Sequence, residues 1–186
     1  FWVELSEQHR PHKVHFTPHT TPDTSALIYE EKDDSFFVGI SRTQSREYLI
    51  INAGDHVTSE ARLLHLKDPK GPLVLVEARK TGHEYDVDHG QDLLFIRTND
   101  THENFRIVKA DPSRPEQEHW EEVIAPSSTQ YIRGHQVFRD FLAIQGRIEG
   151  LDQIHILLSE EKTGYNIDFD EESYTCLLYT SDAADD

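Results

Sequence analysis

Residues 27–64 read LIYEEKDDSFFVGISRTQSREYLIINAGDHVTSEARLL, and this stretch contains the unit that the rest of the chain repeats. An apolar segment that ends in an acidic turn (26–34) comes first, and a segment that begins with two phenylalanines (36–41) follows it. A nearly continuous apolar segment (48–53) and a segment of alternating polar and apolar residues (60–66) come next. Short runs rich in Val, Ile, Phe and Tyr, separated by polar turns, are typical of antiparallel strands. The stretch therefore predicts an all-β fold.

The same pattern returns at a nearly constant spacing. FWVEL at 1–5 stands 47 positions before YLIIN at 48–52, and the series continues at steps of 45 and 48 with LLFIRTN (93–99) and FLAIQG (141–146). A period of about 40–50 residues with four strands per repeat is the pattern of β-propeller blades. We therefore expect a partial β-propeller of about three to four four-stranded antiparallel blades, with the first and last blades incomplete.

The strands within a repeat differ in a way that predicts where each lies. The second strand is apolar at consecutive positions, as expected of a strand enclosed between neighbouring sheets. The first strand of the third repeat instead alternates, with Glu84, Asp86 and Asp88 around Tyr85 and Val87. Because the first strand of a propeller blade lines the central channel, the three carboxylates are candidates for facing a substrate channel.

The composition excludes several classes of function. A length of 186 residues predicts one domain. The net charge of −17 argues against nucleic acid as a partner, because binding phosphates needs a surplus of Lys and Arg. No run approaches the roughly 18–20 apolar residues of a membrane span, and no signal peptide is recognisable. The chain begins inside a predicted strand, so we expect a piece of a longer propeller, cut at both ends.

The last eleven residues do not fit the repeat. CLLYTSDAADD (176–186) resembles the translation of a transposon-end sequencing adapter. We therefore expect a partial propeller domain over residues 1–175 and a non-native tail over 176–186. The tail contains Cys176, the one cysteine of the chain. Without it no thiol remains for a disulfide, a cysteine nucleophile or a zinc site.

Several blocks of the sequence together resemble a known family. YEEKDDSFF (29–37), TSEARLL (58–64), HEYDVDH (83–89) and WEEVIAP (120–126) are similar to the propeller of the oligopeptidase B branch of the prolyl oligopeptidase family, a family of serine peptidases. The similarity extends over roughly residues 1–175. Blocks of this number and length make the resemblance specific.

The resemblance implies a two-domain, cytoplasmic enzyme that works without a cofactor. In such an enzyme the propeller caps an α/β-hydrolase domain, excludes folded proteins and admits short peptides, which a Ser–Asp–His triad cleaves after Lys or Arg. The implied partners of this chain are therefore short basic peptides and a C-terminal hydrolase domain that the chain lacks. No triad residue can be assigned here, because no motif of the catalytic domain is present.

A search for chemistry within the chain finds no catalytic or metal-binding motif. Gly39-Ile40-Ser41-Arg42-Thr43 lacks the second glycine of a nucleophile elbow, and the S-x-x-K match at 159–162 lies in a polar turn. No H-E-x-x-H occurs among the 12 histidines, which we interpret as surface or turn residues. His12 and His15 belong to a histidine-rich segment, and a regular strand places them on opposite faces.

Two alternatives remain open at this stage. The chain is also compatible with a stand-alone β-propeller that serves as a protein-interaction scaffold without enzymatic activity, although Trp-Asp or kelch-type Gly-Gly signatures do not recur in the repeats. The carboxylates at 84, 86 and 88 either steer basic peptides toward a catalytic cavity or simply keep the surface soluble.

Overall fold

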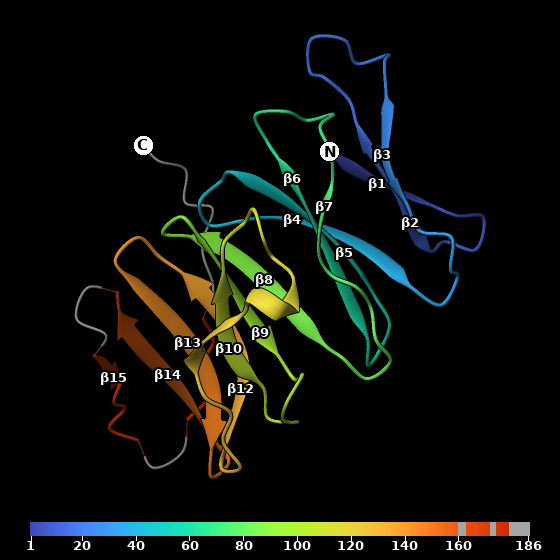
Figure 1. Ribbon diagram of the computed structural model, residues 1–186. Helices are drawn as coiled ribbons and strands as arrows, with labels where there is room; N and C mark the ends of the chain where they lie inside the picture. Colours follow the sequence, from blue (N-terminus) through green and yellow to red (C-terminus); the bar gives the residue numbers. More distant parts are fainter. Residues whose placement is uncertain (160–162, 172–173, 179–186) are drawn as a thin grey trace.

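Four antiparallel sheets follow one another in chain order across the molecule (Figure 1). The structure is a computed structural model that describes residues 1–159, 163–171 and 174–178, and fifteen strands are present in this part of the chain. Consecutive strands pair within each sheet without a crossover. The expected all-β architecture of propeller-like blades is thereby confirmed.

Each sheet is built from consecutive strands of one repeat. The first contains β1 (Trp2–Leu5), β2 (Pro11–Phe16) and β3 (Ala26–Glu30), and the second β4 (Phe37–Arg42), β5 (Tyr48–Gly54), β6 (Ser59–His65) and β7 (Val74–Glu77). The third contains β8 (Tyr85–Gly90), β9 (Leu93–Thr98), β10 (Arg106–Ala110) and β11 (Glu121–Ile124), with the short 3-10 helix η1 (Gln117–His119) before β11. The fourth contains β12 (Gln130–Val137), β13 (Phe141–Ile148), β14 (Leu151–Leu158) and β15 (Gly164–Asn166).

The repeat predicted from the sequence corresponds to equivalent strands in space. β5, β9 and β13 each occupy the second position of a four-stranded sheet. The first sheet has three strands, one fewer than each of the other three sheets. The fourth sheet, expected to be incomplete, has four strands, of which β15 is the shortest at three residues. Its pairing with β14 ends at Asn166, which lies opposite His155.

Apolar clusters fill the boundaries between neighbouring sheets. Val14 of the first sheet packs with Val38, Leu49, Ile51 and Leu64 of the second. The next boundary is filled by residues of the second and third sheets (Ile50, Ala61, Leu63, Val76, Tyr85, Val87, Leu94, Ile96, Val108, Ala110). Successive residues of β5 therefore belong to different clusters, because side chains alternate between the two faces of a strand. This explains the continuous apolar run at 48–53.

Tight hairpins connect the inner strands. The β8–β9 turn has positive φ at Gln91 (55°) and Asp92 (60°), and the β13–β14 turn has positive φ at Glu149 (49°) and Gly150 (88°). Two consecutive residues with positive φ are the geometry of a type I′ turn, whose twist matches that of the flanking strands. The side-chain amide of Gln91 also donates to the carbonyl of Phe138 at 2.7 Å, which links this hairpin to the fourth sheet.

Tyr85 joins the second and third sheets through a bulge. The pairing of β6 with β7 shifts between Ala61 and Arg62, which leaves an irregularity in the ladder. The buried Tyr85 hydroxyl accepts a hydrogen bond from the N–H of Ala61 (2.7 Å) and donates one to the carbonyl of Glu77 (2.6 Å). The side chain from β8 thus satisfies backbone groups that the bulge removes from regular pairing.

Residues 174–178 lie against the fourth sheet. The Thr175 hydroxyl donates to Asp152 Oδ2 at 2.7 Å, and the Gln145 amide donates to the carbonyl of Cys176 at 2.8 Å. Cys176 and Leu178 pack beside an apolar cluster on β13 and β14. The boundary expected at residue 175 stays a prediction, and positions 179–186 of the expected tail lie outside the described residues.

We predict that Tyr85→Phe lowers the free energy of unfolding by about 1–3 kcal/mol, the cost of leaving buried backbone groups without partners. Urea denaturation followed by fluorescence measures the change. Tyr131→Phe is the matched control, because its side chain is 40% exposed and is expected to stay within about 0.5 kcal/mol of the unmodified protein. Equal stabilities of the two variants would contradict the role of the Tyr85 hydroxyl.

Candidate functional site

The predicted channel residues lie on the edge strand of the third sheet. β8 ends the strand order β11-β10-β9-β8, and it contacts β6 of the second sheet and β12 of the fourth. Asp86 and Asp88 lie within β8, and Glu84 directly precedes it. Tyr85 and Val87 pack toward the second sheet, so the three acidic side chains belong to the opposite side of the strand.

The carboxylate of Asp88 connects three sheets. Its Oδ1 accepts hydrogen bonds from the N–H of Gln44 (2.9 Å) in the β4–β5 hairpin and from the N–H of His89 (2.8 Å). Its Oδ2 accepts one from the N–H of Val137 (3.2 Å) on β12. The same hairpin is held again by Ser45, whose N–H donates to the carbonyl of His89 at 3.0 Å. Asp88 therefore links the second, third and fourth sheets at their inner edges.

Asp86 forms a charged cluster with residues of two sheets. Its Oδ2 lies 2.6 Å from the guanidinium of Arg97, and its Oδ1 lies 3.3 Å from Nδ1 of His135 on β12. Arg97 also donates to the carbonyl of Ile132 at 3.2 Å and lies over the ring of Phe105. Burial raises the pKa of Asp86, but the hydrogen bonds and charges of His135 and Arg97 outweigh it and lower the pKa overall.

Glu84 differs from the other two carboxylates. Its N–H donates to the side chain of Asn99 at 2.8 Å, but its own carboxylate makes no hydrogen bond or ion pair with the residues that the structure describes. The structure thus brings Glu84, Asp86 and Asp88 to one strand face, and it engages the last two in contacts between sheets. Glu84 retains the most freedom to meet a ligand.

A second charged cluster joins the first and second sheets. Arg79, after β7, lies 2.6 Å from Glu31 and 2.9 Å from Glu60, and its guanidinium stacks over the ring of Phe36. Burial raises the pKa of Glu60, but hydrogen bonds from Arg79 and Arg62 outweigh it and lower the pKa to about 2. Glu31 and Glu60 are therefore held by specific partners and do not serve only as solvated surface charges.

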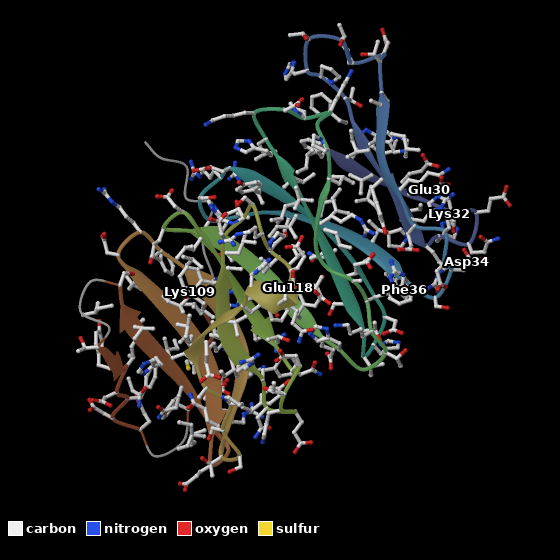
Figure 2. All side chains as sticks on the ribbon, viewed as in Figure 1. Glu30, Lys32, Asp34, Phe36, Lys109 and Glu118 are labelled. Carbon is white, nitrogen blue, oxygen red and sulfur yellow. The ribbon has the colours of Figure 1, made fainter. Side chains whose placement is uncertain are left out.

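Figure 2 labels residues of the segment between β3 and β4, which connects the first sheet to the second. The side chains of Glu30, Lys32 and Asp34 are exposed, whereas Phe36 is buried. Lys13 reaches Glu30 at 3.6 Å, so part of the exposed charge is paired. Pairs of this kind near solvent contribute little to stability.

The histidines were partly misassigned from the sequence. His83 and His89 are buried, and the side chain of His135 is only 1% exposed, so the interpretation of surface or turn residues is wrong for these three. His12 and His15 both approach the carboxylate of Glu4, at 3.7 and 2.7 Å, rather than diverging. A shift of the β1–β2 register beside Glu4 accompanies this arrangement.

The candidate nucleophiles occupy unsuitable places. Ser41 lies inside β4 and pairs with Ile50 of β5. A nucleophile elbow instead places its serine on a strained turn between a strand and a helix. Lys162 of the S-x-x-K match lies outside the described residues. Among those that are described, no three His, Cys, Asp or Glu side chains gather to hold a metal ion, and no helix is long and apolar enough to cross a membrane.

Comparison with known proteins gives a consistent family. The profile of the prolyl oligopeptidase N-terminal beta-propeller domain matches residues 2–186. Protease 2 of Moraxella lacunata is 31% identical over the whole chain, which covers 26% of that protein. Dipeptidyl aminopeptidase BI of Pseudoxanthomonas mexicana is 30% identical over 84% of the chain and 21% of that protein.

A solved structure shows the same arrangement of sheets. Oligopeptidase B from Trypanosoma brucei, in a closed form with covalently bound antipain, superposes on 93% of the chain with a TM-score of 0.85 and 28% sequence identity. The match covers 26% of that protein. The chain therefore spans about a quarter of the length of these relatives.

We predict that Asp88→Asn lowers the free energy of unfolding by about 1–3 kcal/mol, because the amide offers one acceptor oxygen where the carboxylate offers two to backbone donors. Glu84→Gln is the matched control on the same strand face, and it should change the stability by less than about 0.5 kcal/mol. Chemical denaturation of both variants measures the difference. Indistinguishable midpoints would contradict the bridging role of Asp88.

Proposed function

The chain belongs to the prolyl oligopeptidase family through its N-terminal β-propeller domain, and on that premise we propose that it forms part of a propeller that admits short peptides to a serine peptidase domain. The observation that supports this best is the likeness to the closed oligopeptidase B structure over 93% of the chain. Stacked sheets around a channel exclude folded proteins by size, because a folded domain is wider than the gap between inner strands.

We extend the proposal to cleavage after Lys or Arg by a Ser–Asp–His triad in a C-terminal α/β-hydrolase domain. Two features support this step: the sequence blocks shared with the oligopeptidase B branch, and the similarity to a protein whose structure holds covalently bound antipain. No residue of this chain takes part in bond cleavage in this scheme. The propeller supplies the gate and the scaffold, and we place the enzyme in the cytoplasm.

The proposed domain comprises residues 1–175, with 176–186 as a non-native tail. The adapter-like sequence CLLYTSDAADD supports this boundary. In this proposal, the hydrogen bond from Thr175 to Asp152 belongs to the native domain. The packing of Cys176 and Leu178 beside β13 and β14 belongs to the non-native tail. A version of the protein that ends at residue 175 should retain the stability of the longer chain.

We predict that the full-length protein cleaves short peptides after Lys or Arg, whereas the 186-residue chain alone cleaves none. Fluorogenic peptides that differ only in the residue before the scissile bond measure the preference, and a serine-directed phosphonate should abolish it. A folded protein that contains the same sequence should resist cleavage, because it is too wide for the gate. Cleavage by the chain alone, or equal cleavage of the folded protein, would contradict the proposal.

Steering by the channel carboxylates gives a separate prediction. In the full-length enzyme, Glu84→Gln should lower kcat/KM for a dibasic peptide by roughly two- to threefold at low salt and flatten its salt dependence, because a local negative charge attracts the peptide. Glu7→Gln, at an exposed position on the β1–β2 turn, is the control. Identical rate constants and salt slopes for the two variants would leave Glu84 a role in solubility only.

A further inference from the structure

His135 lies at the boundary between the third and fourth sheets with both ring nitrogens facing acceptors. Its Nε2 is 2.9 Å from the carbonyl oxygen of Phe95, and its Nδ1 is 3.3 Å from Oδ1 of Asp86. A carbonyl and a carboxylate can only accept hydrogen bonds. Because Nε2 needs its proton for the Phe95 carbonyl, a neutral ring turns the lone pair of Nδ1 toward the Asp86 carboxylate. The contact with Asp86, which is an ion pair rather than a hydrogen bond, is attractive only when the imidazole is charged.

The charges around His135 favour this state. β8 contributes Asp86 and Asp88, and β9 contributes Arg97, whose guanidinium binds the other oxygen of Asp86. Burial by itself lowers the pKa of His135, but the close contact with the Asp86 carboxylate, the charge of Asp88 and the Phe95 carbonyl outweigh it and raise the pKa above its ordinary value of 6.5.

We propose that His135 is a proton-operated latch between the third and fourth sheets, closed while its imidazole is charged. Loss of the proton replaces an attractive contact across the boundary with a lone pair facing the Asp86 carboxylate. Asp86 keeps Arg97, a partner from its own sheet, so the loss falls on the link to the fourth sheet. The latch does not depend on the proposed peptidase function.

A cavity lies between the third and fourth sheets, on the same boundary as His135. It lies further out along this boundary, has a volume of about 330 Å³ and is lined by residues of both sheets that include Leu93, Phe95, Val123, Leu142 and Leu157. The outer parts of these two sheets are therefore not fully closed against each other. A buried apolar cluster that includes Ile107, Ile132 and Ile144 fills the rest of this boundary, and His135 and Asp88 add polar contacts at its inner edge.

The direction of the pH dependence follows from the raised pKa. A group whose pKa is higher in the folded protein stabilises it fully below the ordinary value of 6.5, and this contribution is lost as the pH rises through the folded value. The boundary between the third and fourth sheets should therefore loosen on the alkaline side, above pH 6.5.

The test combines the charge state of the ring with the opening of the boundary in the same sample. Long-range proton–nitrogen correlation in ¹⁵N-histidine-labelled protein should show both His135 nitrogens protonated at pH 6.5, with deprotonation at higher pH. Over that step, the protection factor of the Ile132 amide, which donates across the boundary to the carbonyl of Asn104, should fall roughly tenfold. The Ile51 amide, inside the second sheet, should keep its protection.

A variant of the carboxylate separates the latch from general alkaline destabilisation. Asp86→Asn removes the negative charge and should move both the ring titration and the exchange step to lower pH, whereas Glu84→Gln should leave both in place. A neutral His135 at pH 6.5 would overturn the proposal. So would a titration that leaves the Ile132 amide unchanged, or an equal loss of protection at Ile51.

Discussion

The arrangement of the second, third and fourth sheets depends on hydrogen bonds between the Asp88 carboxylate, at the inner edge of the third sheet, and the backbone of the two neighbouring sheets. Apolar packing between sheets is strong but non-directional, so it does not by itself set the angle or register at which one sheet meets the next. Asp88 supplies that direction, because its two oxygens bind N–H groups from the sheet before and the sheet after its own. Tyr85 does the same for the second boundary through its hydroxyl.

The apolar clusters hold neighbouring sheets together through both faces of each inner strand. β5 and β9 place alternate side chains in two different boundaries, so each sheet needs a neighbour on both faces. Within the described part of the chain, the first sheet packs against the second sheet alone, and Trp2 and Leu27 remain 43% and 52% exposed. A chain that spans about a quarter of its relatives therefore presents, at its first sheet, surface that resembles an interface between blades more than a solvent-facing surface.

The sequence predicted the strands well and the roles of polar residues less well. The apolar runs at 48–53 and 93–99 predicted β5 and β9 to within one residue at each end, because a strand enclosed between two sheets is apolar at consecutive positions. Gln44 and Val137 lie 44 and 49 positions from Asp88, and the Phe95 carbonyl lies 40 positions from His135, so no local pattern reports these contacts. The alternation around Tyr85 did not reveal that Asp86 and Asp88 have partners in other sheets, and the substrate-channel role of the carboxylates stays a prediction.

The central claim is that the Asp88 carboxylate binds the backbone of both adjacent sheets. Amide hydrogen exchange of the unmodified protein at the N–H groups of Gln44 and Val137 tests this most directly. Both belong to positions where regular strand pairing does not supply the acceptor, since each donates to Asp88. The account predicts protection comparable to that of strand amides within β5. Exchange as fast as at the exposed amides of Thr20 and Asp23 would contradict it.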